Sequence, residues 1–308
     1  MGESIALLGE CMLELSRQAD ADASQSLPMN LSYGGDTLNS AVYLARQGVA
    51  VDYVTALGDD PMSDWMLQQW ESEGVGCDFV VRETGAVPGM YLIETDDHGE
   101  RSFYYWRDNA PARRLLDQPE QSRSLFQRLH DHDYLGLSGI SLAILSRASR
   151  HLLFDLLAEY RSGGGKVVFD GNYRPRLWDS LGEAREFYES MYRLTDIALP
   201  TIEDEQAIFE DADQGGVIER LRSWGVTEVA LKMGELGCLV ATDGELELVA
   251  ANKINVVDTT SAGDSFNAGY LAARLAGRPA PEAARAGHEL AAIVIQHRGA
   301  IIPASAMP

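Results

Sequence analysis

Short apolar runs rich in Val, Ile and Leu alternate along the chain with segments in which apolar residues recur every three or four positions. The short runs are typical of buried strands, and the longer segments are typical of amphipathic helices. Strands are predicted at IALLG, VDYVTALG, YLGLS, KVVFD, DIALP and EVALK, and helices over 37–47, 61–73, 145–160, 184–194, 205–209, 265–276 and 281–296. Because strands that alternate with helices favour βαβ units, we expect an α/β fold with a mostly parallel central sheet flanked by helices.

Two segments, at about 12–33 and 90–107, break this alternation and contain period-2 stretches with no helix between them. In the second, LIETDDHGERSFYYW indicates a hairpin that turns at 97–99. These pieces are expected to form a small second sheet, which in an enzyme would act as a lid. No long linker or internal repeat is visible, so residues 1–308 are interpreted as a single domain with inserted lid strands.

The composition describes a protein that can bury a large core, with 308 residues of which 45% are hydrophobic. No apolar run approaches the roughly 20 residues that a membrane helix needs. The first apolar run follows an acidic residue, and no Lys or Arg precedes Arg17, which is unlike a signal peptide. A cytoplasmic location with no membrane partner is therefore expected.

Neither the cysteines nor the histidines are spaced like metal ligands. Cys11, Cys77 and Cys238 are odd in number and far apart, which argues against a disulfide framework and against a zinc site. The six histidines show no HExxH-like spacing, so no protein-bound metal site is predicted.

The formal charge is −22, from 25 Lys and Arg against 47 Asp and Glu. Such a field repels phosphate backbones and anionic membrane surfaces, so nucleic acids are not expected as partners. Any site for an anion must therefore rely on locally placed cations and backbone N–H groups.

The string Asp258-Thr-Thr-Ser-Ala-Gly-Asp264 carries the clearest chemistry. It follows a predicted strand, INVV, and opens a helix with an apolar stripe. Small residues let a ligand approach the backbone, and the unpaired N–H groups of a first helical turn favour a phosphate. Asp264 would then take the proton of an attacking hydroxyl, although an acidic helix cap is a common alternative for such a string.

This string resembles the C-terminal signature of ribokinase-type (PfkB) sugar kinases, Asp-Thr-x-Gly-Ala-Gly-Asp. The resemblance implies a ribokinase-like fold, Asp264 as catalytic base, and Ser261, Ala262 and Gly263 as the anion hole. Ser261 departs from the usual Gly, but serine is still small.

Other segments resemble the same family in the same order. Gly34-Gly35-Asp-Thr-Leu-Asn39 is similar to the diglycine motif that joins lid to core, which implies that Gly34, Gly35 and Asn39 hold substrate hydroxyls. The resemblance implies a nucleotide side made of Thr201, Lys232, Gly234, Gly237 and His288. Thr201 stands where the family commonly has Asn, and His288 falls near the adenine position.

Several segments are similar to 2-keto-3-deoxygluconate kinases within that family: GGDTLNSAVYLARQG, GERSFYYWR, YLGLSGISLAILS, DGNYRPRLW and QHRGAIIP. Their acceptor carries a carboxylate, which the planar fork of arginine matches. Strand alternation puts Tyr105 and Arg107 on one face, and Arg174 follows a buried strand at the edge where open α/β sheets bind ligands. The resemblance adds Tyr91 and Asn172 as further contacts to the keto acid.

The expected reaction is therefore ATP-dependent phosphorylation of 2-dehydro-3-deoxy-D-gluconate to its 6-phosphate, with Mg²⁺ bridging the phosphates. A monovalent cation such as K⁺ beside the phosphate loop, and a homo-oligomer formed through the lid, are left open by the resemblance. The alternatives are a kinase for a neutral sugar or nucleoside, which the two arginines disfavour, and a catalytically silent sugar-acid sensor, which an intact Asp264 disfavours. A dinucleotide-dependent dehydrogenase is weaker still, because no GxGxxG follows the first strand.

Overall fold

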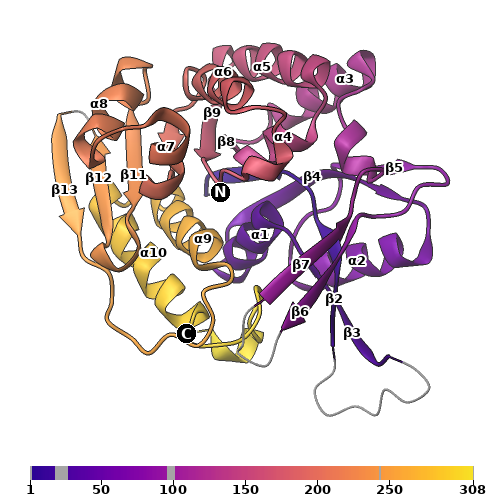
Figure 1. Cartoon of the computed structure of the whole chain (residues 1–308). Coiled ribbons are helices and arrows are strands. Elements are labelled where there is room, and N and C mark those ends of the chain that lie inside the picture. Colours follow the sequence, from indigo (N-terminus) through magenta and orange to yellow (C-terminus); the bar gives the residue numbers. More distant parts are fainter. Residues whose placement is uncertain (1, 18–26, 96–100, 243, 308) are drawn as a thin grey trace.

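The computed structural model describes residues 2–17, 27–95, 101–242 and 244–307. Its centre is a nine-stranded sheet in the order β13-β12-β11-β10-β9-β8-β1-β4-β5 (Figure 1). The parallel part comprises β1 (Ser4–Leu8), β4 (Ala50–Gly58), β5 (Val80–Glu83), β8 (Tyr134–Ser138), β9 (Lys166–Asp170), β10 (Ile197–Ala198) and β11 (Glu228–Lys232). Among the described residues of this sheet, the antiparallel pairs are β11 with β12 (Cys238–Thr242) and β12 with β13 (Glu245–Val249), so the predicted mostly parallel sheet is confirmed.

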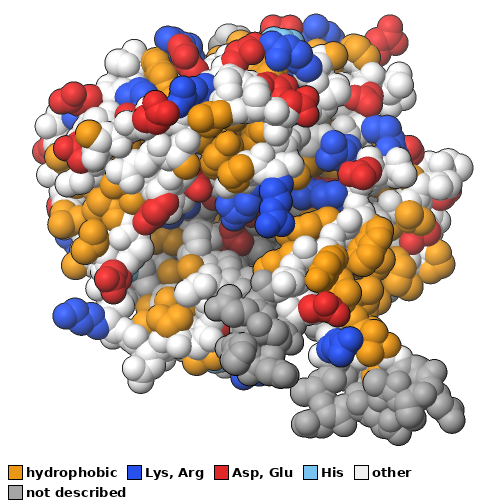
Figure 2. All heavy atoms as spheres, viewed as in Figure 1, with side chains coloured by type: hydrophobic (Ala, Val, Ile, Leu, Met, Phe, Trp, Pro, Cys, Tyr) orange, Lys and Arg blue, Asp and Glu red, His pale blue; other side chains and the backbone are white. Residues whose placement is uncertain are grey.

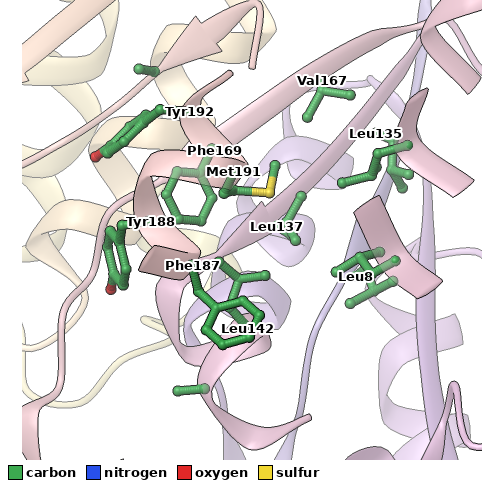
Figure 3. Close-up of a cluster of buried hydrophobic side chains, with 14 of the residues drawn as sticks. Leu8, Leu135, Leu137, Leu142, Val167, Phe169, Phe187, Tyr188, Met191 and Tyr192 are labelled. Atoms are coloured by element: carbon green, nitrogen blue, oxygen red, sulfur yellow. The ribbon is translucent and has the colours of Figure 1, made fainter. Parts of the chain in front are cut away.

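Helices cover both faces of this sheet, and each face has its own hydrophobic core. One face carries α1 (Asp36–Arg46), α2 (Pro61–Ser72), α9 (Ala262–Leu275) and α10 (Ala280–Val294). The other carries α3 (Pro119–Leu129), α4 (Gly139–Ile144), α5 (Arg147–Ser162), α6 (Leu181–Tyr192), α7 (Ile202–Phe209) and α8 (Gln214–Ser223). In Figure 3, Phe169 of β9 and Leu137 of β8 lie against Phe187 and Met191 of α6. None of the helices in the described ranges is long and apolar enough to cross a membrane.

The differences from the predicted elements have local causes. The helix expected over 145–160 is α5, which begins two residues later because Ser146 caps its start, and the short α4 before it was not predicted. The strand predicted at INVV is wrong: 254–257 is irregular, and Val256 and Val257 are exposed. The amides of Val257 and Asp258 donate to the Ile295 carbonyl at the end of α10, so the segment is held by a helix end rather than by a strand.

A second sheet, in the order β3-β2-β6-β7, is built from β2 (Met12–Arg17), β3 (Met29–Gly34), β6 (Met90–Thr95) and β7 (Arg101–Trp106). It stands out from the body of the molecule (Figure 1). All four strands fall within the two period-2 segments. The turn predicted at 97–99 lies outside the described residues, as do residues 18–26.

The topology brings polar residues to one edge of the central sheet. Asp170 and Lys232 end β9 and β11, Glu10 follows β1, and Thr201 follows β10. Because carboxyl ends of parallel strands share an edge, these residues gather beside the N-terminus of α9 and the base of the second sheet. The candidate site lies there.

Candidate active site

Asp264 lies in the first turn of α9, which begins at Ala262, three residues earlier than predicted. Its Oδ2 accepts hydrogen bonds from Asn39 Nδ2 at 2.8 Å and from Ser261 Oγ at 2.9 Å. Ser40 Oγ donates to the Asp264 carbonyl at 3.0 Å, which ties α1 to α9. The residue as a whole is partly exposed, while these contacts hold its carboxylate in place.

The pKa of Asp264 is raised to about 7, first by burial and then by the charges of Asp36 and Asp170. The hydrogen bonds from Asn39 and Ser261 act in the opposite direction, because they stabilise the ionised form. A carboxylate with a pKa near neutrality is well matched to general base catalysis at physiological pH.

Ser261, where the family signature has Gly, takes the left-handed conformation with φ of 63°. A side chain is strained there, which explains why glycine is usual at this position. The serine compensates with a contact that glycine lacks, the hydrogen bond from its Oγ to Asp264. In the described chain the N–H groups of Gly263 and Asp264 donate to no acceptor, which leaves a helix N-terminus suited to an anion.

Lys232 lies beside this helix start. Its Nζ is 3.0 Å from Asp170 Oδ1 and 3.0 Å from Asn267 Oδ1, and Asn267 Nδ2 donates to Asp170 Oδ2 at 2.8 Å. A Cβ placed on Gly263 would be 3.6 Å from the same Nζ. The ammonium group therefore lies next to the predicted anion hole and is held by the buried Asn267 and the partly buried Asp170.

The predicted nucleotide residues form a chain of contacts on the other side of Lys232. Thr201 makes a parallel bridge to Lys232, and its Oγ1 is 3.3 Å from Asp204 Oδ2. Gly237 has φ of 107°, and a Cβ there would be 2.1 Å from the Val249 carbonyl, so only glycine fits. The same carbonyl is 3.2 Å from His288 Nε2.

Gly234 also has a positive φ, of 55°, and starts the short turn between β11 and β12. His288 packs edge-on against Phe266 of α9, with ring centroids 5.0 Å apart, and burial lowers its pKa. The histidine is thus a neutral, half-buried group at neutral pH.

On the second sheet, the predicted sugar-binding residues Tyr91 and Tyr105 lie in one row with Glu14, which was not predicted. Glu14, Tyr91 and Tyr105 are directly opposite one another in register. The Tyr91 hydroxyl donates to Glu14, and the Tyr91 and Tyr105 rings are 5.8 Å apart. A Cβ on Gly34 would be 2.5 Å from the Tyr91 hydroxyl, so glycine makes room for this row.

The two predicted carboxylate-binding arginines differ in their surroundings. Arg107 is buried with 8% of its surface exposed, its guanidinium lies 5.9 Å from the Tyr105 ring centroid, and it forms an ion pair with Glu10. Arg174 is exposed and donates to the Tyr173 carbonyl at 2.8 Å. Across the described ranges the two arginines make no contact with each other.

The remaining predicted residues, Asn172 and Gly35, lie at the start of α1 and beside the segment after β1. Asn172 has φ of 35°, and its Nδ2 donates to Asp36 Oδ2 at 2.6 Å. A Cβ on Gly35 would be 2.2 Å from the Glu10 carbonyl. The structure thus brings Gly34, Gly35, Asn39, Asn172 and Asp264 around the start of α1.

The polar side chains of Glu10, Glu14, Asp36, Asp170 and Asn267 were not selected from the sequence, although each contacts a predicted residue. Glu10 and Asp170 stand at or just after the ends of strands and Asp36 stands inside the diglycine motif, which was a signal for these three, whereas Glu14 within β2 and Asn267 within α9 offered none. Figure 2 shows a recess on this face, with acidic side chains inside it and a group of Lys or Arg side chains at its rim.

The sequence model of the pfkB family carbohydrate kinases matches residues 3–307, and the chain belongs to that family. The chain is 50% identical over 314 aligned positions to the 2-dehydro-3-deoxygluconokinase of Dickeya dadantii, with 99% of each chain covered. It is 49% identical over 316 positions to the enzyme of the same name from Escherichia coli (strain K12), with 100% of each chain covered. A fructokinase of Klebsiella pneumoniae is 28% identical, over 88% of this chain and 84% of the other.

Two solved structures support the fold. The 2-dehydro-3-deoxygluconokinase of Thermotoga maritima superposes with a TM-score of 0.85 at 22% identity, covering 98% of this chain and 95% of the other. A putative Ribokinase II from E. coli in complex with ATP and Mg²⁺ gives a TM-score of 0.83 at 22% identity, covering 97% and 94%. The central sheet, its flanking helices and their order are therefore those of a ribokinase-like fold, as predicted.

Proposed function

We propose that this protein transfers the γ-phosphoryl group of ATP to the terminal hydroxyl of 2-dehydro-3-deoxy-D-gluconate and releases the 6-phosphate. The main support for this proposal is the position of Asp264: its carboxylate has a pKa of about 7 and is held at an open helix N-terminus beside Lys232. The name shared by the relatives that are about half identical over their full length supports the choice of acceptor.

Asp264 acts as the general base. The hydrogen bonds from Asn39 and Ser261 fix one carboxylate oxygen, which leaves the other free to take the proton of the acceptor hydroxyl. Such a positioned base contributes typically 10²–10⁴-fold to a rate. Because phosphoryl transfer depends mainly on positioning and charge stabilisation, the contribution falls towards the lower part of that range.

The phosphates lie at the N-terminus of α9, against the anion hole of Ser261, Ala262 and Gly263. The free N–H groups there, the helix dipole and Lys232 offset negative charge as it moves between the reacting oxygens. Thr201, Gly234, Gly237 and His288 make the nucleotide side.

Mg²⁺ fits this arrangement as a cation carried mainly on the nucleotide. In the parts of the chain that the structure describes, no group of three or more His, Cys, Asp or Glu forms a ready-made metal cage. Mg²⁺ typically uses one or two carboxylates together with substrate phosphates and water, and Asp170 and Asp204 lie near Lys232 for this purpose. When bound, the ion supplies charge neutralisation on the phosphates. A monovalent cation near the same loop stays a prediction.

The sugar acid lies between the two sheets. Gly34, Gly35, Asn39 and Asn172 hold its hydroxyl end beside Asp264, and Tyr91, Tyr105, Arg107 and Arg174 surround its carboxylate end. The chain acts as a single domain of residues 1–308 whose second sheet closes over the acceptor, with Gly34 and Gly35 between β3 and α1 as the hinge. A cytoplasmic enzyme that assembles through this lid is the accompanying proposal.

A coupled ATP-consumption assay tests the function. The acceptors are 2-dehydro-3-deoxy-D-gluconate, its neutral analogue 3-deoxyhexulose with a hydroxymethyl in place of the carboxylate, fructose, ribose and adenosine. We expect kcat/KM to be highest for the keto acid, with phosphate on its terminal hydroxyl. A higher kcat/KM for any neutral acceptor, or no turnover at all, would make the proposed function wrong.

A further inference from the structure

Glu10 lies where the second sheet joins the body of the molecule. It stands between β1 and β2, and its ion-pair partner Arg107 directly follows β7. A Cβ on Gly89, the residue before β6, would be 3.2 Å from Glu10 Oε1, and a Cβ on Gly35, just after β3, would meet the Glu10 carbonyl. The bases of all four strands of the second sheet therefore meet around this one acidic residue.

The Arg107 side chain depends on Glu10 for its position. Its Nη2 donates to the Glu10 carboxylate, and only 8% of Arg107 and 3% of Glu10 are exposed. In the part of the chain that the structure describes, the Arg107 side chain donates to no other acceptor. An arginine side chain has several rotatable bonds, so this one charge-assisted hydrogen bond selects the orientation of the guanidinium group.

The selected orientation places Arg107 beside the row of Glu14, Tyr91 and Tyr105. The guanidinium lies 5.9 Å from the Tyr105 ring centroid, and Tyr105 is directly opposite Tyr91 in register. The proposed function places the carboxylate end of the acceptor at this row. Glu10 itself is out of reach of the acceptor, because only 1% of its side chain is exposed.

Two buried atoms of the Glu10–Arg107 pair are left over. Within the described ranges, Glu10 Oε1 and Arg107 Nε have no hydrogen-bond partner. Buried polar atoms are normally satisfied, and a pair that served the fold alone would be expected to follow that rule. An unpaired donor on the guanidinium that Glu10 fixes favours a role in binding, because the carboxylate of an acceptor can complete it.

We propose that Glu10 is a positioning residue for the acidic acceptor: it holds the Arg107 guanidinium in the orientation that receives the acceptor's carboxylate. The inference rests on the proposed function, because it assumes that Arg107 binds that carboxylate. Glu10 acts through its hydrogen-bonding oxygen, since its charge by itself repels a second carboxylate. The acceptor's carboxylate is at the opposite end from the reacting hydroxyl, so Glu10 affects acceptor binding and leaves the chemical step unchanged.

Three variants test the proposal. Glu10→Met keeps the size of the side chain but offers no oxygen to Arg107, Glu10→Gln keeps an oxygen and loses the charge, and Glu83→Met is a control that breaks the more exposed ion pair between Glu83 and Arg114. KM and kcat are measured for the keto acid and for 3-deoxyhexulose.

We expect Glu10→Met to raise KM for the keto acid by about ten- to a hundredfold, the size of losing one charge-assisted hydrogen bond. Its kcat, and both constants for 3-deoxyhexulose, should stay as in the wild type. Glu10→Gln should keep KM for the keto acid at or below the wild-type value, and Glu83→Met should change the constants for neither acceptor.

A double-mutant cycle shows whether Glu10 acts through Arg107. Arg107→Met alone should raise KM for the keto acid, and adding Glu10→Met to it should raise KM no further, because no guanidinium is then left to position. Replacing both members of a buried ion pair with apolar side chains is less destabilising than leaving one charge unpaired, so the double variant is expected to fold.

Each outcome bears on a different statement. A wild-type enzyme that does not prefer the keto acid to 3-deoxyhexulose contradicts the proposed function. Where that preference is present, an unchanged KM in Glu10→Met or an equal loss for both acceptors overturns the role of Glu10. A loss in Glu10→Gln as large as in Glu10→Met, or a further loss in the double variant, overturns it as well. If Glu10→Met does not fold, Glu10→Asp gives the same comparison, because its shorter side chain draws the guanidinium out of place.

Discussion

Replacing the proposed base, Asp264→Asn, should remove activity and at the same time stabilise the fold in a pH-dependent way. Asparagine keeps the size of the side chain and can still accept the hydrogen bonds from Asn39 and Ser261, but it carries no charge. In the wild type, burial and the charges of Asp36 and Asp170 make the ionised carboxylate unfavourable, which is why its pKa is raised from 3.8 to about 7. The variant avoids that unfavourable charge.

The magnitude follows from the shift of the pKa. About three pH units, at about 1.4 kcal/mol per unit, mean that ionised Asp264 costs the folded state about 4 kcal/mol. Because the pKa of Asp264 is higher in the folded than in the unfolded protein, the folded protein holds the proton more tightly. The free energy of unfolding therefore falls as pH rises from about 4 to about 7 and then levels off. The variant lacks this fall. Its advantage should therefore grow from about 2 kcal/mol at pH 5 to about 4 kcal/mol at pH 8.

Urea unfolding of both proteins at pH 5, 6, 7 and 8 measures this difference, and a parallel assay measures kcat, which should drop by roughly 10²–10⁴. Asp155→Asn, on an exposed position of α5, is the control and should show no pH-dependent difference. The reasoning is refuted if the advantage of Asp264→Asn is constant or shrinks with rising pH. Near wild-type turnover would separately remove Asp264 from the mechanism.

Three further outcomes are expected. Arg174→Ala should lower kcat/KM for the keto acid by roughly 30-fold to several-thousand-fold and leave 3-deoxyhexulose nearly unaffected, and equal losses would mean that Arg174 supports the fold or the nucleotide. Gly35→Ala should lower the melting temperature and kcat/KM, because its Cβ would lie 2.2 Å from a backbone oxygen. Gly182→Ala on α6 should lower neither, because its Cβ would meet only Ser180 Oγ, at an ordinary contact distance of 3.8 Å. The kcat/KM should fall below a pH of about 7, because Asp264 then takes up a proton. Asp36→Asn should move this acidic limb of the pH profile to lower pH, because it removes one of the charges that raise the pKa of Asp264 and leaves Asp170 and Lys232 in place. An unmoved limb in Asp36→Asn would show that Asp36 does not tune the base.

The central sheet could be predicted because its signal is local. Buried parallel strands must be apolar on both faces, so runs such as KVVFD are visible without knowing their neighbours. The helices α3, α4 and α8 were not predicted. α3 and α8 are mostly polar, although Leu125, Phe126 and Leu129 of α3 recur at helical spacing, and α4 has only six residues. INVV was mistaken for a strand because apolar runs also occur in loops held by helix ends. The helix that begins near Asp264 could be predicted from small residues followed by an apolar stripe, and the role of Asp264 as a base came from the resemblance of the whole string to the family signature.

The hydrogen-bond and ion-pair partners of the site residues could not be predicted from the sequence. Asn39 meets Asp264 across 225 positions, Asn172 meets Asp36 across 136, and Arg107 meets Glu10 across 97. The sequence by itself determined which residue types stand at the ends of strands and at the helix start. Only the tertiary structure decided which charges cancel and which remain, because a charge acts through distance and burial, and both are set by how the strands and helices pack. It thereby paired Arg107 with Glu10.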